Sequence, residues 1–162
     1  MKLSPLFSCL LAATLLAASP ARADDITPSK GQTLYLPIYS HLWHGDLKSD
    51  GMPFKSLVSA LVSVRNTDLK TPIRVTSARY YDTNGKLLQE FVPTPKTIPA
   101  MGTHELYVER KESAGGSGAN FVVQWESAAS ANPPVVEALH ADIQGNRTIT
   151  FLTWGRPIRS EK

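Results

Sequence analysis

Residues 56–67, SLVSALVSVRNT, form the most regular stretch of the chain, because apolar side chains alternate there with small or polar ones. Successive side chains of a β-strand point to opposite faces, so every second residue shares a face. One face of this stretch is aliphatic and consists of Val58, Ala60, Val62 and Val64. The pattern predicts a strand that buries this face in a hydrophobic core and ends at the turn residues 66–68.

Seven further stretches predict strands: residues 34–39, 73–82, 86–92, 103–110, 120–126, 135–142 and 148–154. Asn84-Gly85 and Gly145-Asn146 mark tight hairpins, since such residues tolerate positive φ. Trp125 follows Phe121 and Val123 on one face and is the best candidate for a core tryptophan. No stretch has a helical period. About eight short strands between turns predict an all-β fold, a single immunoglobulin-like antiparallel β-sandwich of about 7–9 strands.

Three further structural features can be predicted from the proline residues, the glycine residues and the alternation of side chains along the strands. Pro37 cannot donate to a ladder, so residues 34–39 should form an edge strand or contain a bulge. Residues 41–53 contain two glycines, two aspartates and a proline and predict a loop. The two-residue period points Tyr80 and Tyr107 away from the core.

The first residues have the layout of a cleaved secretory signal peptide. Lys2 precedes an apolar run, and small residues, Ala21 and Ala23, occupy the −3 and −1 positions of a cleavage site. We expect cleavage after Ala23 and a periplasmic or secreted protein with no membrane span after cleavage. An uncleaved anchor is the alternative, although the apolar run is short for one. Lipidation at Cys9 is a minor alternative, because little apolar sequence precedes this residue.

The predicted organisation is a signal peptide over residues 1–23, a flexible leader over residues 24–30, a β-sandwich domain over residues 31–158 and a tail over residues 159–162. The chain has 17 basic and 14 acidic residues. Loss of Lys2 and Arg22 leaves 15 basic against 14 acidic residues, a net charge of +1. Without clustered basic residues the sequence excludes a nucleic-acid surface. The mature chain has no cysteine, so its core must stabilise it without disulfides.

Four separated segments resemble, in the same order, a family of small exported bacterial proteins. They are YLPIYSHLWHG (residues 35–45), SVRNTD (63–68), RYYDTNGKL (79–87) and GGSGANFVVQW (115–125). The family is catalogued as domain-of-unknown-function family 3124, and the similarity runs from about Gly31 to Pro157. The resemblance implies an envelope protein with a compact domain. It implies no activity, substrate or catalytic residue.

Exposed aromatic side chains are the first candidates for recognition. Tyr35, Tyr39 and Trp43 fall in or just after the first predicted strand and could form an apolar patch with Tyr80 or Tyr107. Loops at the end of a sandwich often carry recognition, and an edge strand can accept a partner strand. The alternative is that a second sheet or the leader covers these rings. We therefore expect a binding or accessory module whose partner is an unknown envelope protein or a small ligand.

The loop histidines are the second candidate site. His41 and His44 lie three residues apart and could bind Zn²⁺ or Cu²⁺ with His104 or His140 as a third ligand. The alternative is that both are loop residues packed beside Trp43. A blue-copper site is excluded in the mature chain, because it needs a cysteine thiolate. No other cofactor is expected.

Catalytic motifs are weak. Ser117 lies in Gly115-Gly116-Ser117-Gly118, but a nucleophile elbow needs glycine two residues after the serine and a following helix, and position 119 is alanine. A tight turn before a core strand explains the glycines. The sequence therefore predicts no enzyme activity and no catalytic residue, and a hydrolase remains the third alternative.

The metal hypothesis has a direct test. If His41 and His44 are ligands, the gently purified protein holds stoichiometric Zn²⁺ or Cu²⁺, and the His41→Ala, His44→Ala double variant loses it. Elemental analysis measures the metal content. A purified protein without metal, whose melting temperature does not change when metal is added, would contradict the hypothesis.

Overall fold

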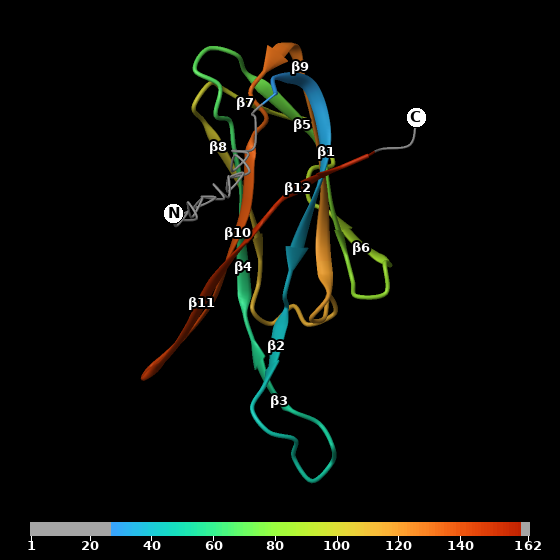
Figure 1. Cartoon of the computed structure of the whole chain (residues 1–162), viewed down its shortest axis with the longest axis vertical. Coiled ribbons are helices and arrows are strands. Elements are labelled where there is room, and N and C mark those ends of the chain that lie inside the picture. The colour runs from blue at the N-terminus through green and yellow to red at the C-terminus, as the bar shows by residue number, and fades with distance from the viewer. Residues whose placement is uncertain (1–26, 160–162) are drawn as a thin grey trace, which may run out of the picture.

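Two antiparallel sheets pack face to face in the computed structural model, which describes residues 27–159 (Figure 1). One sheet has the order β12-β1-β9-β5-β6, with β7 also on β5, and the other has the order β11-β10-β4-β8. The strands of the first are β12 (Arg156–Ile158), β1 (Ser29–Ile38), β9 (Ala119–Ala131), β5 (Ile73–Tyr81), β6 (Leu87–Glu90) and β7 (Lys96–Ile98). Those of the second are β11 (Arg147–Trp154), β10 (Val135–Gln144), β4 (Ser59–Arg65) and β8 (Thr103–Val108). The prediction of an all-β sandwich is confirmed.

The core lies between the two sheets and follows the predicted alternation. Every member of the aliphatic set Val58, Ala60, Val62 and Val64 is at most 1% exposed. Phe121, Val123 and Trp125 are buried opposite them on β9. Burial of apolar side chains is the main force that holds such a sandwich together. The structure describes twelve strands, where the sequence predicts about eight, and the immunoglobulin-like type stays a prediction.

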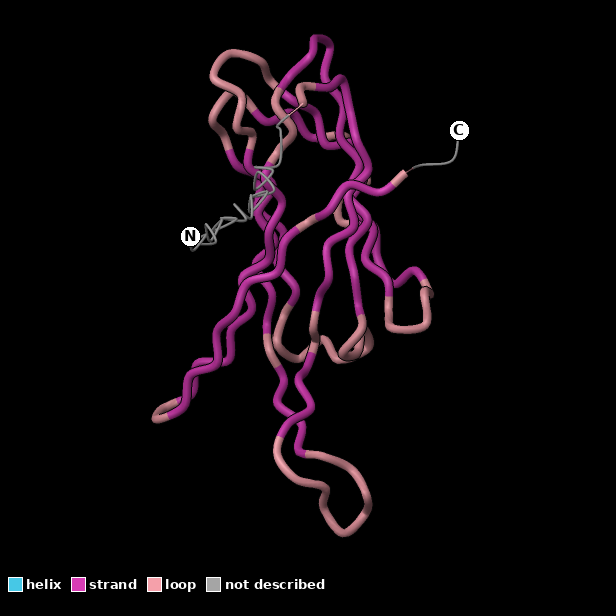
Figure 2. The backbone as a smooth tube through the Cα atoms, in the orientation of Figure 1, coloured by secondary structure: helices cyan, strands magenta, loops and turns pink. Residues whose placement is uncertain are grey.

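A narrow ribbon extends the sandwich at one end (Figures 1 and 2). β2 (His41–His44) continues β1 after Ser40, and β3 (Phe54–Leu57) leads into β4 after Val58. β2 pairs with β3, so the ribbon joins a strand from each sheet. The prediction of a loop over residues 41–53 is therefore wrong for its first four residues. Gly45 and Gly51 have positive φ, which explains the turn signals in the remainder.

The phase of β5 changes within the strand. Ile73 and Val75 are buried, and so are Ala78 and Tyr80, because the register with β9 shifts between Val75 and Ser77. A bulge adds one residue to a strand and moves every later side chain to the other face. The prediction that Tyr80 points away from the core is wrong for this reason. Its ring is 1% exposed and stacks on Phe121 at 5.1 Å between centroids.

Two other expectations need correction at the edge of the six-stranded sheet. β9 pairs with β1 along its length, whereas β12 pairs only with residues 33–35, so β1 is an edge strand over residues 29–32 and around Pro37 but not between them. Residues 156–158, which no predicted strand includes, form β12, the outermost strand of this sheet. The signal-peptide prediction concerns residues 1–23, which lie outside the described residues. Within residues 27–159 the chain forms no helix that could span a membrane.

A buried polar cluster fixes the glycine-rich loop against the ribbon end of the sandwich. The Tyr80 hydroxyl lies 2.9 Å from Ser40 Oγ and donates to Glu112 Oε2 at 2.8 Å. The other carboxylate oxygen of Glu112 accepts the backbone N–H of Ala114 at 2.8 Å. A side chain at Gly115 would place a Cβ 2.6 Å from Ser40 Oγ and closer still to the Tyr80 hydroxyl. The loop therefore needs glycine there because the backbone approaches the cluster too closely for a side chain. Burial, with the Glu112 carboxylate, raises the pKa of Tyr80.

Candidate functional site

A hollow opens on the surface where β1 and the chain leading into β12 separate. The ladder pairs Thr33 with Ile158 and Tyr35 with Arg156, and then stops. Next to this point lies a hollow of about 400 Å³. It is lined by Tyr35, Pro37, Tyr39, Leu152, Thr153, Trp154 and Arg156. We call this hollow the aromatic groove.

Local chemistry explains why the strands separate here. Pro37 has no N–H and cannot extend the ladder. Thr153 holds the two strands together instead, by donating its hydroxyl to the Pro37 carbonyl at 2.7 Å. The chain then passes from the four-stranded to the six-stranded sheet at Gly155, whose N–H donates to the Val136 carbonyl at 2.7 Å. A Cβ at Gly155 would lie 3.1 Å from that of Val136, so the small residue permits this close crossing.

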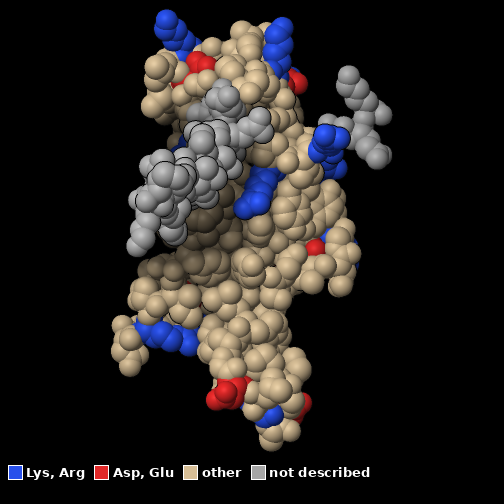
Figure 3. Space-filling view, in the orientation of Figure 1, with Lys and Arg blue, Asp and Glu red and all other residues tan. Residues whose placement is uncertain are grey.

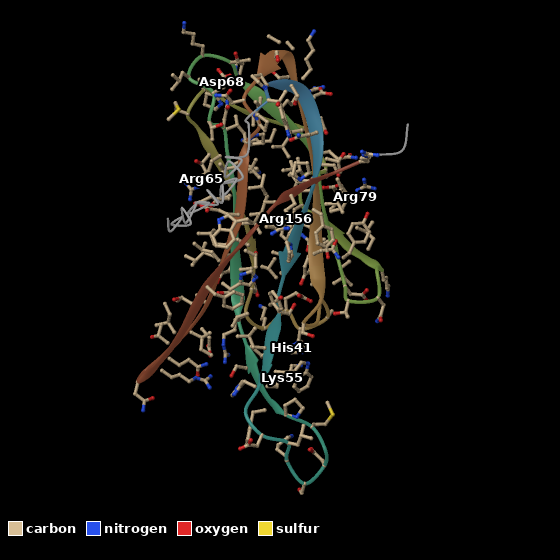
Figure 4. All side chains as sticks on the ribbon, in the orientation of Figure 1. His41, Lys55, Arg65, Asp68, Arg79 and Arg156 are labelled. Atoms are coloured by element: carbon tan, nitrogen blue, oxygen red, sulfur yellow. The ribbon has the colours of Figure 1, made fainter. Side chains whose placement is uncertain are left out.

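The walls of the groove combine exposed aromatic rings with one cation. Trp154 is 58% exposed and Tyr35 is 37% exposed, although both lie in or next to paired strands. Arg156, which Figure 4 labels, is exposed. The ladder pairs it directly with Tyr35. In the space-filling view the middle of the visible face is mostly uncharged, with basic side chains near β12 (Figure 3). Such a surface can stack on flat or apolar groups and attract a carboxylate.

The back of the groove is rigid. The Tyr39 ring makes edge contacts with Phe151 at 5.6 Å and with His140 at 5.9 Å between centroids. His140 stacks on Phe151 at 4.4 Å, and its Nε2 accepts the Tyr39 backbone N–H at 3.1 Å. The His140 side chain is fully buried, and burial lowers its pKa to about 4. The imidazole is therefore neutral at neutral pH, as an acceptor must be.

A second arginine lies on the same outer face of the six-stranded sheet. The register places Arg156, Tyr35, Val122 and Arg79 in one row across β12, β1, β9 and β5. The Arg79 Nε is buried and has no hydrogen-bond partner within the described residues. Figure 4 shows Arg79 and Arg156 well away from His41 and Lys55, which lie on the ribbon. The groove therefore carries the positive charge of Arg156, whereas Arg79 lies opposite the Glu90 carboxylate of β6 in the ladder.

Two of the three predicted aromatic residues meet in the groove, and one does not. Tyr35 and Tyr39 line it, whereas Trp43 lies on β2 and makes an edge contact with His41 at 5.0 Å. Lys55 Nζ lies 5.8 Å from the centre of the Trp43 ring. Trp154 also lines the groove, although it is not among the site residues predicted from the sequence. Leu152 and Trp154 share one face of the predicted strand with Thr148 and Thr150. The residues of the opposite face are equally apolar, so the alternation alone could not show which face is exposed.

The other candidate tyrosines lie elsewhere. Tyr80 is in the core, as described above. Tyr107 is 56% exposed on β8, at the far edge of the four-stranded sheet from β11. Neither residue lines the aromatic groove.

The four histidines are spread over β2, β8 and β10. His41 and His44 lie three apart in a strand, so they point to opposite faces of the ribbon. His41 is 6% exposed, and both its ring nitrogens lack hydrogen bonds, whereas His44 Nε2 lies 2.9 Å from Ser56 Oγ. Burial and then the Lys55 charge lower the pKa of His41. Residues 27–159 contain no group of three or more metal-ligating side chains of the His, Cys, Asp or Glu type. The metal site stays a prediction.

Ser117 lies in the turn that precedes β9, as the sequence predicts, next to Gly116 with its positive φ. In the described part of the chain no hydrogen bond joins a histidine ring to the Ser117 hydroxyl. The hydrogen-bonded histidine nitrogens contact Tyr39 and Ser56 instead. This arrangement does not support the hydrolase alternative.

The burial of His140 makes the stability of the protein sensitive to acid. The unfolded chain takes up a proton at the ordinary pKa of 6.5, whereas the folded chain does so only at about 4. Between these values the unfolded state binds more protons, so the free energy of unfolding falls as the pH decreases. We expect a loss of about 3 kcal/mol between about pH 7 and about pH 4, measured by urea unfolding across this interval.

A His140→Gln variant provides the control. Glutamine keeps an acceptor for the Tyr39 N–H but does not titrate. His41 and the carboxylates are present in both proteins, so the difference between the two pH profiles reports His140. Equal losses in the two proteins would show that His140 is not the titrating group.

Comparisons with known proteins supply a family and no activity. The model of the family described as a protein of unknown function (DUF3124) matches residues 31–158. No curated protein matches the chain. The crystal structure of Thermotoga maritima 1070 is similar with a TM-score of 0.41 and 14% sequence identity, over 77% of this chain and 92% of that chain. On the family match, the chain belongs to the DUF3124 family of proteins of unknown function.

Proposed function

We propose that this protein is a non-catalytic binding or accessory module of the bacterial cell envelope, and that a segment of its partner lies in the aromatic groove. The observation that carries the proposal is the exposure of Trp154 beside Tyr35 on a rigid scaffold. Tryptophan and tyrosine offer large contact areas at low cost in side-chain entropy, and they dominate the energy of many interfaces.

The groove also has the shape and charge that an extended segment needs. Its walls include β1 and the chain that leads into β12, which pair at Tyr35 and Arg156 and then separate, so the hollow is open at the surface. Pro37 and Leu152 add apolar surface between the rings, and Arg156 adds a cation at one end. An apolar segment with a carboxylate near Arg156 matches this arrangement, because guanidinium groups pair with carboxylates in two-pronged geometry.

The proposed location follows from the amino-terminal sequence. The layout of residues 1–23 is that of a signal peptide, and the expected mature chain carries no cysteine, so it needs no particular redox state. The absence of catalytic function is part of the proposal. Glu112, the carboxylate nearest the glycine-rich loop, is held by two hydroxyl groups and by backbone N–H groups, which is typical of a structural role.

Partner capture tests the groove directly. Mature protein bearing an affinity tag captures its partner from envelope extracts of the producing bacterium, and quantitative mass spectrometry measures the yield. Trp154→Ala and Tyr35→Ala each remove an exposed ring without disturbing the core, so we expect capture to fall by about tenfold or more. Leu69→Ala, at a loop residue that is 75% exposed and does not line the groove, is the matched control.

Trp43→Ala separates the groove from the ribbon. Trp43 is exposed but does not line the groove, so this variant should capture the partner as well as the wild-type protein. Loss of capture in Trp43→Ala, with full capture by Trp154→Ala, would assign recognition to the ribbon and reject the groove.

A further inference from the structure

A second cavity, of about 520 Å³, lies next to the Gly155 crossing. The ladder pairs Leu34 with Pro157, and both residues line this cavity. Leu34 is 3% exposed and belongs to the core, so this pair faces the space between the two sheets. The next pair, Tyr35 with Arg156, points outward and lines the aromatic groove. We call the cavity on the inner side the inter-sheet pocket.

The walls of the inter-sheet pocket are mostly apolar and carry no charged side chain. Of the eleven described residues that line it, none is an aspartate, glutamate, lysine, arginine or histidine. Val136 on β10 is 3% exposed, as Leu34 is, so the pocket reaches the core of both sheets. Pro133 and Pro134 add apolar surface where β10 begins. A pocket of this volume suits a small apolar molecule, whereas an ion would lose its hydration there without a counter-charge.

Two buried polar atoms at this place lack hydrogen bonds. Gln32 lines the pocket, and its Oε1 is buried without a partner within the described residues. Trp125 lies directly opposite Gln32 in the ladder between β1 and β9, and its indole Nε1 is likewise buried and unpartnered. The Cβ atoms of such a pair are about 5 Å apart. A buried acceptor and a buried donor therefore lie close together, and each such group needs a partner.

We propose that the inter-sheet pocket binds an uncharged, largely apolar molecule that carries a hydroxyl group. A hydroxyl group has one donor position and two acceptor positions. It can therefore donate to Gln32 Oε1 and accept from the Trp125 indole N–H at the same time, while the apolar remainder fills the pocket. Thr67, which also lines the pocket, already donates its own hydroxyl to the Pro133 carbonyl at 3.1 Å. Gln32 and Trp125 thus select the ligand.

Three probes of one chain length separate the effects of donor, acceptor and charge. 1-Octanol carries the hydroxyl group, methyl octyl ether has an acceptor but no donor, and octanoate is charged. We expect the mature protein to bind octanol with a dissociation constant of roughly 100 µM. The ether should bind at least about fivefold more weakly, because it leaves Gln32 Oε1 unpaired. Octanoate should bind at least about tenfold more weakly, because the pocket supplies no cation.

Nuclear magnetic resonance of the ¹⁵N-labelled protein measures the binding and reports its location. The chain has three tryptophans, so substitution of each by phenylalanine assigns the three indole N–H resonances. We expect octanol to move the resonance of Trp125, because its N–H gains an acceptor. The resonance of Trp43, on the ribbon, should stay in place.

Gln32→Leu removes the unpaired acceptor at nearly constant size. This variant should bind octanol at least about fivefold more weakly than the wild-type protein and should no longer prefer octanol to the ether. Gln89→Leu, at an exposed glutamine of β6 that does not line the pocket, is the matched control and should behave as the wild-type protein. Melting temperatures confirm that both variants are folded.

Two results would overturn the proposal. One is a wild-type Trp125 resonance that stays in place up to the solubility limit of octanol. The other is a Gln32→Leu protein that keeps the wild-type preference for octanol over the ether. The first result needs no variant, so the proposal can be rejected even if Gln32→Leu does not fold.

The proposal does not rest on partner binding in the aromatic groove. Gln32 does not line the groove, and Tyr35 does not line the inter-sheet pocket. Trp154 borders both cavities, so its variant is not used to separate them. Gln32→Leu should capture the partner normally, and Tyr35→Ala should bind octanol normally. Loss of octanol binding with capture intact would concern the pocket alone, and the reverse would concern the groove alone.

Discussion

The crossing of the chain at Gly155 is the feature on which the rest of this surface depends. It carries the last strand from one sheet to the other, so that β11 pairs with β10 and β12 pairs with β1. The backbone hydrogen bond to Val136 and the lack of a Cβ make the close approach possible. Because Pro37 interrupts the β1 ladder opposite this crossing, the strands separate and leave the aromatic groove. The proposed binding surface thus depends on two properties of the backbone, the missing N–H of proline and the small size of glycine.

Buried polar groups hold the two ends of the sandwich and keep that surface in place. At one end Asn66 is 2% exposed, and its side-chain amide donates to the carbonyls of Thr71 at 2.9 Å and Pro99 at 3.0 Å. The N–H groups of Lys70, Thr71 and Asn132 hold the pKa of Asp68 at about 2. At the other end the Tyr80 and Glu112 cluster fixes the glycine-rich loop. Because hydrogen bonds of buried polar groups hold both ends of the sandwich, the strands between them keep their side chains in fixed positions. A recognition surface requires such fixed positions.

The sequence predicts the strands that bury one face and fails where geometry changes within a strand. The β4 alternation and the Asn84-Gly85 turn are local signals, and the structure contains both features. Tyr80 is misassigned because a bulge earlier in β5 shifts its phase, and no local residue pattern marks that bulge. The sequence also misses β12, since a short polar strand that contains proline has no core face. Trp154 could not be placed beside Tyr35, because the pairing of residues more than a hundred positions apart depends on the crossing at Gly155.

The most direct measurement of the central claim is site-specific photo-cross-linking in the living cell. A benzoyl-phenylalanine side chain at position 35 reports contact in the aromatic groove, and the same side chain at position 43 reports contact at the ribbon. If the groove is the recognition surface, irradiation attaches a partner at position 35 and leaves position 43 free. A partner attached at position 43 and absent at position 35 would contradict the claim.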